Sequence, residues 1–108
     1  MQKTTAAAGT PKKFGVSNYP NPFNPSTTIN VELPEASKVT LVIYDLRGRE
    51  VMSWNREHQK SGYMRIEWDG RDRSGNSVSA GMYLYRLQAR SFESEKNFVA
   101  VRKMLFLK

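Results

Sequence analysis

Cysteine is absent from this sequence, and histidine occurs once, as His58. Without thiols no disulfide can support the fold, so the hydrophobic core has to do so alone. The same shortages exclude a cysteine- or histidine-ligated zinc site and a Ser-His-Asp arrangement, because the required partners are missing. No nucleophile-elbow serine is present either. We therefore expect no enzyme and no cofactor, with His58 exposed in a loop at 55–61.

Long hydrophobic runs are also missing. No apolar stretch approaches the ~20 residues that a membrane helix requires. The first residues, Met1 to Thr10, lack the apolar segment of a secretory signal, because Ala6-Ala7-Ala8 is too short. If the protein is exported, its signal has to lie outside this sequence, which would then be one part of a longer protein.

Acidic residues are in the minority, with 10 aspartates and glutamates against 17 lysines and arginines and a formal net charge of +7. Such an excess can serve nucleic acid, anionic lipid or an acidic glycan. The basic residues are scattered along the chain, however, and do not form a run. A solvated, charged surface accounts for this distribution, and we expect no nucleic-acid partner.

The 108 residues, of which 39% are hydrophobic, suffice for one domain with a modest core. Residues 1–13 are small, polar and basic, which is typical of a flexible linker. From Phe14 onward the apolar residues tend to recur at every second position, which is the periodicity of a strand. The predicted organisation is a linker at 1–13 followed by a domain at 14–108.

Within this domain, clusters of turn-forming residues separate the alternating segments, and no segment has a helical period. The better-defined predicted strands are 27–33, 39–44, 49–54, 62–68, 81–90 and 97–108. This pattern predicts an all-β fold, an immunoglobulin-like antiparallel β-sandwich of about seven strands. The side chains expected in its core are Ile29, Val31, Leu41, Ile43, Ile66, Trp68, Tyr83 and Tyr85.

A proline-rich segment, Asn18 to Pro25, leads into the strand expected at 27–33. Its prolines, Pro20, Pro22 and Pro25, exclude a helix and hold the backbone extended or turned. The segment carries no nucleophile, acid or ligand cluster. We expect the prolines to be structural and to hold the end of the preceding strand against one end of the sandwich.

One cluster near the middle of the domain has two interpretations. Asp69, Asp72 and Asn76 are a candidate metal site, although the EF-hand spacing and its closing glutamate are absent. The alternative is a tight turn in which the aspartates accept backbone hydrogen bonds.

Two aromatic residues form a further candidate site. Trp54 and Tyr63 flank a polar loop and are the best candidates for an exposed sugar-stacking platform.

The last segment of the sequence, Val99 to Lys108, is apolar with basic residues in between. One interpretation is an ordinary final strand. The other is a recognition strand, because the edge of a sheet can pair with a partner through main-chain hydrogen bonds while the side chains give specificity.

Five segments, in this order, resemble the C-terminal sorting domain of cargo proteins of the type IX secretion system. They are Gly15–Pro25, Val39–Asp45 with Gly48-Arg49, Trp68-Asp69-Gly70, Gly81-Met82-Tyr83 and Arg102-Lys103-Met104-Leu105. The resemblance extends over residues 14–108, and its last segment stands at the C-terminus of the sequence. The same segments are similar to the immunoglobulin-like part of flagellar hook-capping proteins, a related sandwich that does not usually end in a short basic and apolar strand.

The resemblance to sorting domains implies a protein that is secreted or held at the cell surface. Such cargo reaches the periplasm by an ordinary signal, and the sorting domain directs it through the outer membrane. The implied partners are the outer-membrane secretion machinery, a sortase-like peptidase that cuts before Phe14, an anionic lipopolysaccharide for anchored cargo, and an N-terminal cargo domain absent from this sequence. The residues that the resemblance implies for recognition by the secretion machinery are Gly81, Tyr83, Arg102, Lys103, Met104, Leu105, Phe106, Leu107 and Lys108.

The sequence thus favours a non-catalytic sorting module, with two alternatives open. A carbohydrate-binding accessory module would be favoured by Trp54 and Tyr63 exposed on one surface. A flagellar hook-cap or other structural assembly domain would be favoured by a native chain that continues past Lys108.

Overall fold

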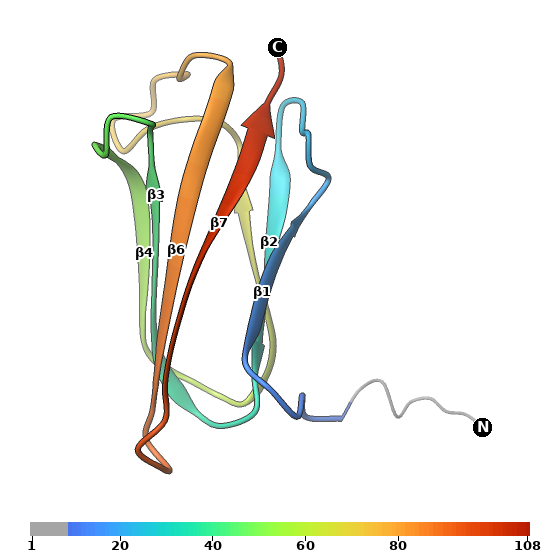
Figure 1. The fold of residues 1–108 in the computed structure, drawn as a ribbon, viewed down its shortest axis with the longest axis vertical. Coiled ribbons are helices and arrows are strands. Elements are labelled where there is room, and N and C mark those ends of the chain that lie inside the picture. Colours follow the sequence, from blue (N-terminus) through green and yellow to red (C-terminus); the bar gives the residue numbers. More distant parts are fainter. Residues whose placement is uncertain (1–8) are drawn as a thin grey trace, which may run out of the picture.

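The computed structural model describes residues 9–108 and contains seven strands and no helix among them. The strands are β1 (Gly15–Tyr19), β2 (Thr27–Leu33), β3 (Ser37–Tyr44), β4 (Glu50–Gln59), β5 (Gly62–Trp68), β6 (Gly81–Ser91) and β7 (Asn97–Phe106). They form two antiparallel sheets, in the orders β1-β2-β5 and β4-β3-β6-β7, which lie face to face (Figure 1). The predicted immunoglobulin-like sandwich is confirmed. No helix in the described part of the chain is long and apolar enough to span a membrane.

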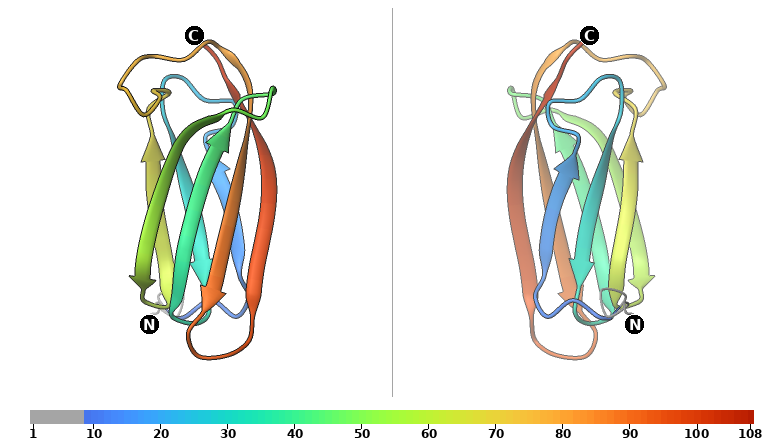
Figure 2. Two further views of the ribbon diagram at one scale, coloured as in Figure 1. Left: turned by 90° about the vertical axis from the view of Figure 1, so that its left-hand side faces the viewer. Right: turned by 90° about the vertical axis from the view of Figure 1, so that its right-hand side faces the viewer.

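Figure 2 shows the two sheets of the sandwich from both sides. The core lies between them, and every second residue of the central strands β2 and β6 is buried there. Ile29 and Val31 of β2 and Leu41 and Ile43 of β3 are each 0% exposed. Burying one such aliphatic side chain stabilises the fold by about 1.5–3 kcal/mol. All eight side chains expected in the core are buried, which confirms the prediction made from alternation.

Strand β4 extends beyond the short strand expected at 49–54. The polar run expected as a loop at 55–61 continues the strand as far as Gln59. His58 therefore lies in a strand, where it is exposed and stacks on Phe92 with ring centroids 4.7 Å apart. Main-chain pairing with β3 holds this edge strand, and its last residues bury little, so the alternation that marks a half-buried strand is missing from the sequence.

The start of the domain is described only in part. Residues 1–8 of the linker expected at 1–13 lie outside the described residues. Of the others, Pro11 is buried and its neighbours on both sides are exposed. Phe14 stacks on Phe98 of β7 with ring centroids 5.6 Å apart. The boundary between linker and domain stays a prediction.

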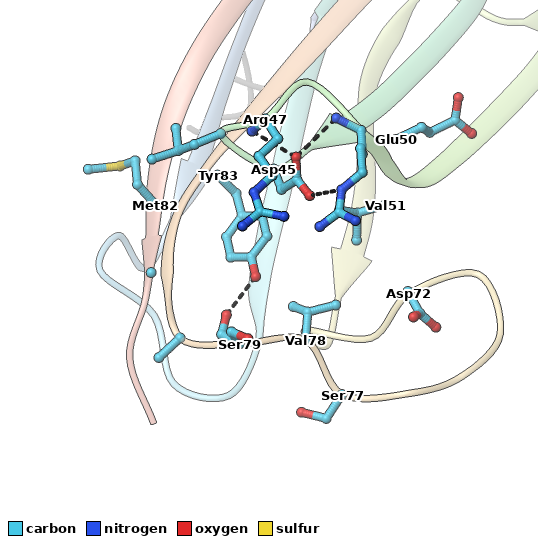
Figure 3. A pocket seen from close by; sticks show the side chains of 14 residues that line it. Asp45, Arg47, Glu50, Val51, Asp72, Ser77, Val78, Ser79, Met82 and Tyr83 are labelled. Atoms are coloured by element: carbon cyan, nitrogen blue, oxygen red, sulfur yellow. Dashed lines mark hydrogen bonds and ion pairs between the residues drawn. The ribbon is translucent and has the colours of Figure 1, made fainter.

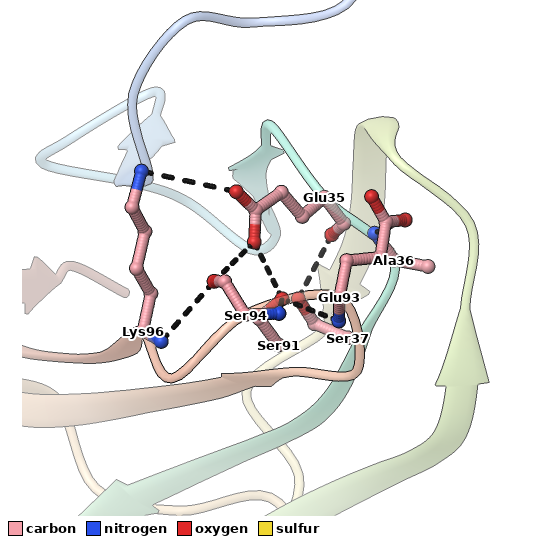
Figure 4. A network of polar contacts seen from close by, with 7 residues as sticks. All are labelled: Glu35, Ala36, Ser37, Ser91, Glu93, Ser94 and Lys96. Atoms are coloured by element: carbon pink, nitrogen blue, oxygen red, sulfur yellow. Dashed lines mark hydrogen bonds and ion pairs between the residues drawn. The ribbon is translucent and has the colours of Figure 1, made fainter.

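A carboxylate network ties two turns together at the end of the sandwich opposite the C-terminus (Figure 4). Glu35, between β2 and β3, accepts hydrogen bonds from Ser91 Oγ at 2.5 Å and Ser94 Oγ at 2.6 Å. Its second oxygen lies 3.8 Å from Lys96 Nζ. The hydrogen bonds from Ser91 and Ser94, with the charge of Lys96, lower the pKa of Glu35 below its ordinary value.

Replacing Glu35 with glutamine is expected to lower the melting temperature at about pH 7 and to matter less near pH 3. The pKa of the carboxyl is lower in the folded than in the unfolded chain, where it is near the ordinary 4.5. Its contribution is therefore fully present above the unfolded pKa and is lost as the pH falls through the folded pKa. Thermal unfolding of both proteins across this range checks the prediction. A difference in melting temperature that does not change with pH would contradict it.

Candidate functional site

The candidate recognition residues of the C-terminal strand divide into a buried and an exposed group. Met104 and Phe106 belong to the core, with 1% and 3% of their surface exposed, and Leu105 is half-buried. The exposed members are Arg102, Lys103, Leu107 and Lys108. Only the exposed group and part of Leu105 are available to a partner of the folded domain.

Phe106 anchors the end of β7. Its ring stacks on Phe23 with centroids 4.9 Å apart, and it lies 6.3 Å from Trp68. A Cβ on Gly70 would come within 2.7 Å of the Phe106 ring, and the φ of +77° at Gly70 also favours glycine. The Trp68-Asp69-Gly70 segment therefore packs directly against the C-terminal strand.

The proline-rich segment between β1 and β2 lies along the outer edge of β7. The Phe23 N–H donates to Leu105 O at 2.9 Å, and the Leu107 N–H donates to Phe23 O at 2.9 Å. The Asn21 side chain donates from Nδ2 to Lys103 O at 3.1 Å, and its Oδ1 accepts from the Leu105 N–H at 3.0 Å. The outer edge of β7 is thus hydrogen-bonded from Lys103 to Leu107 within the domain itself.

This closed edge limits how a partner can bind. A strand added along residues 103–107 would have to displace Asn21 and Phe23. The segment that carries them is itself held, because Thr27 Oγ1 donates to Pro20 O at 2.8 Å and Asn18 Nδ2 donates to Thr27 Oγ1 at 3.1 Å. A partner strand would therefore have to displace a segment that is hydrogen-bonded both to the end of β1 and to the last residues of β7.

Gly81 and Tyr83 lie at the same end of the molecule but line a different feature. This is a pocket of about 650 Å³ between the turn after β3 and the loop before β6 (Figure 3). Tyr83 is buried, and its hydroxyl donates to Ser79 O at 2.6 Å. Residues 102–108 do not line the pocket. Gly81 and Tyr83 nevertheless stand opposite Phe106 and Met104 in the β6–β7 pair. The structure therefore brings these candidate recognition residues side by side in the sheet but does not gather all of the candidates in one pocket.

Charged groups at the pocket are held by their neighbours. Asp45 Oδ1 accepts the backbone N–H groups of Arg47 and Arg49 at 2.9 and 3.0 Å, and Oδ2 accepts from Arg49 Nε at 2.9 Å. The backbone hydrogen bond from Arg49 is the main reason that the pKa of Asp45 is lowered. Burial, with a smaller effect of Asp45, raises the pKa of Tyr83. An ionised carboxylate and a protonated tyrosine do not exchange protons near neutral pH, so these groups suit binding better than acid–base chemistry.

A second buried tyrosine links the two sheets. The Tyr85 hydroxyl donates to Asn18 Oδ1 at 3.1 Å, across from β6 to β1. Burial raises the pKa of Tyr85 to about 12. The hydroxyl therefore stays protonated and keeps donating this bond throughout the neutral range.

The polar residues of the candidate metal site do not converge. Asp72 Oδ1 accepts the N–H groups of Ser74 at 2.9 Å and Asn76 at 3.0 Å. The Asp69 carboxylate lies 3.7 Å from Arg71 Nε. Within residues 9–108, no three or more histidine, cysteine, aspartate or glutamate side chains are grouped to hold a metal ion. The contacts of Asp72 are those of the tight turn that was the alternative interpretation.

Trp54 and Tyr63 do not form a shared platform. Trp54 of β4 stands opposite buried Leu41 of β3 and packs against the core. Tyr63 points away from the core on β5 and is 57% exposed. The condition that would have favoured a carbohydrate-binding module is therefore not met, because β4 and β5 are consecutive in the chain but belong to different sheets.

Asn21 and Phe23 are the residues at this site that sequence analysis did not single out. Phe23 is 1% exposed, and a large apolar side chain in an otherwise polar turn is a signal of burial that was available in the sequence. The role of Asn21 had no such signal, because its partner Lys103 lies 82 positions later.

The comparisons with known proteins agree with this fold. A family model described as the FlgD Ig-like domain matches residues 17–92. Dimeric latent PorU from Porphyromonas gingivalis is similar with a TM-score of 0.68 and 26% identity, over 85% of this chain and 9% of that chain. FlgD from P. aeruginosa is similar with a TM-score of 0.58 and 28% identity, over 74% of this chain and 59% of that chain.

A third solved structure shares the fold. It is PorZ, an essential bacterial surface component of the type IX secretion system of Porphyromonas gingivalis, with a TM-score of 0.53 and 21% identity over 87% of this chain and 12% of that chain. No curated protein sequence matches the chain. The chain thus spans less than two thirds of each of these three structures.

The family match begins in β1 and ends at Phe92, just after β6. It covers more than half of the sequence and confirms the similarity to the immunoglobulin-like part of flagellar hook-capping proteins. The chain therefore belongs to the FlgD Ig-like domain family.

Proposed function

We propose that this domain is a non-catalytic sorting module that directs an attached cargo protein across the outer membrane by the type IX route. The observation that carries the proposal is the C-terminal strand, which displays exposed Arg102 and Lys103 on a folded sandwich and is followed by exposed Lys108. These are residues that the sequence resemblance to sorting domains assigns to recognition. Met104 and Phe106 fix the strand in the core, so the exposed side chains have defined positions for a receptor to bind.

The proposal includes the route and the partners. The domain folds in the periplasm and is then bound by the outer-membrane secretion machinery. A sortase-like peptidase cuts before Phe14, where Lys12 and Lys13 are exposed, and the cargo is released or joined to an anionic lipopolysaccharide at the cell surface. A positively charged domain, with a formal net charge of +7, is attracted to such an anionic surface.

A second candidate is a structural assembly domain of the flagellar hook-cap type. The family match and the similarity to FlgD favour this function as directly as the sequence resemblance favours sorting. The matched residues 17–92 do not include β7. The C-terminal strand is therefore the place at which an experiment can separate the two functions.

The test is to fuse the domain behind a signal peptide and a passenger protein in a bacterium with a type IX system. Replacing both Lys103 and Lys108 with alanine is expected to reduce secretion several-fold and to leave passenger in the periplasm. Both side chains are exposed, so the change should lower the free energy of unfolding by less than about 1 kcal/mol.

The matched control replaces two other exposed cations with alanine, Lys60 in the turn between β4 and β5 and Arg65 of β5, neither of which is in β7. It removes the same charge and should be secreted normally. Failure of the unaltered fusion to leave the periplasm would overturn the sorting function and favour the structural one. Equal loss of secretion in both variants would mean that total charge, and not the C-terminal strand, is recognised.

A further inference from the structure

The outer face of β6 and β7 is apolar and basic. We define the β6–β7 outer face as Met82, Leu84, Arg86, Val101, Lys103 and Leu105, which alternate with the inward-facing residues of these strands. Of its apolar members, Val101 is 51% exposed and Met82 is 37% exposed, and neighbouring Val99 is 45% exposed. This is a high exposure for apolar side chains on a single sheet face.

Strand register makes this surface continuous. Met82 stands opposite Leu105, Leu84 opposite Lys103, and Arg86 opposite Val101. Residues that are opposite in an antiparallel pair point to the same side of the sheet with their Cβ atoms about 5 Å apart. On the far side of β6, Tyr44 of β3 is opposite Leu84, and Val42 is opposite Arg86. Val42 is only 8% exposed, so the accessible surface extends onto β3 mainly at half-buried Tyr44.

The charges within the β6–β7 outer face have one sign. Arg86 and Lys103 are its only charged members, and neither is in an ion pair within residues 9–108. They lie between apolar side chains, not on a rim around them. A complementary surface would place carboxylates opposite these two cations and apolar side chains opposite Leu84 and Val101.

The closed edge of β7 leaves this face as the accessible part of the strand. Asn21 and Phe23 occupy the hydrogen-bonding edge from Lys103 to Leu107, and Met104 and Phe106 point into the core. A partner that binds the folded domain along residues 103–107 therefore contacts the outward-facing side chains. On this part of β7 a sheet face, and not an open strand edge, is available for recognition.

We infer that the β6–β7 outer face is the docking surface for a protein of the secretion machinery whose own contact surface is apolar and carries carboxylates; this inference rests on the proposed sorting function. A second copy of the chain fits less well, because a symmetric contact would bring Arg86 and Lys103 close to the same cations of the other copy. An anionic bilayer fits less well because Leu84 and Leu105 are half-buried and do not protrude for insertion.

The experiment replaces both Val99 and Val101 with glutamate in the passenger fusion. The new carboxylates would then face the apolar side chains of the partner and lie beside its carboxylates, and we expect secretion to fall by about tenfold or more. The matched control places glutamates at Ser17 and Tyr63, exposed strand positions of the other sheet, and should be secreted as the unaltered fusion is. A second variant with threonine at Val99 and Val101 keeps the side-chain shape and so the fold, and should show a smaller loss of secretion.

Thermal unfolding of each purified domain shows which variants are folded. Normal secretion of the folded glutamate or threonine variant would overturn the inference while leaving the sorting function intact. Failure of the unaltered fusion to be secreted would overturn the sorting function itself, and the inference with it. Two other results would also overturn the inference. One is binding of the unaltered domain to phosphatidylcholine–phosphatidylglycerol vesicles, and the other is dimerisation of the unaltered domain. Either counts if the glutamate variant loses the binding or the dimerisation and the control variant keeps it.

Discussion

Replacing Trp68 with alanine is expected to lower the free energy of unfolding of this domain by about 3–5 kcal/mol. Trp68 is 1% exposed, and its ring centroid lies 5.4 Å from that of Tyr83 and 5.6 Å from that of Phe23. Its Nε1–H also donates to Arg71 O at 2.8 Å. A cavity would remain after the substitution, because its aromatic neighbours come from separate parts of the chain that cannot all move inward.

Equilibrium unfolding in urea, followed by circular dichroism, measures this effect. The control is Tyr63 to alanine, which removes an exposed aromatic side chain from the same strand and should cost less than about 0.5 kcal/mol. A cost for the Trp68 substitution no larger than that of the control would mean that the aromatic cluster does not support the fold.

Deleting residues 103–108 is expected to unfold most of the domain. The deletion removes the buried side chains of Met104 and Phe106, and substituting either one with alanine alone would cost about 2–5 kcal/mol. It also removes the last part of the pairing with β6 and the bonds to Asn21 and Phe23. The summed loss of stability is comparable with the free energy of unfolding of a typical domain, which is about 5–15 kcal/mol.

The control deletion removes only Leu107 and Lys108, which follow β7 and are exposed. It breaks one hydrogen bond to Phe23 and should cost about 1 kcal/mol. Circular dichroism and heteronuclear NMR spectra of both truncated proteins distinguish the outcomes. A domain without 103–108 that still unfolds cooperatively at close to the original urea concentration would contradict the prediction.

These two predictions concern one cluster, in which Phe106 of the C-terminal strand packs on Phe23 and Trp68. The proposed recognition strand is therefore also part of the core. Loss of secretion after a large deletion would follow from unfolding alone. For this reason the tests of sorting and of docking use substitutions of exposed side chains and compare them with matched controls.

The fold class and most of the core could be predicted from the pattern of residues. Alternation in β2, β3, β5 and β6 is a local property, because successive residues of a strand point to opposite faces wherever the strand lies. Burial of Ile29, Leu41, Ile66 and Tyr83 could therefore be predicted without knowing which strands are neighbours. The turn at Asp72 was also within reach, since an aspartate that bonds to amides two and four positions later is a local arrangement.

The surfaces that are available for binding, in contrast, depend on how distant segments pack together. The separation of Trp54 from Tyr63 depends on the sheet that each strand joins, and the closed edge of β7 depends on contacts between Asn21 and residues more than 80 positions away. Such contacts leave no periodic pattern, because one asparagine and one phenylalanine suffice to make them. The alternation of apolar residues along a strand predicts which of its side chains are buried. Whether the edge of the strand is open to a partner depends instead on which distant segment folds against it.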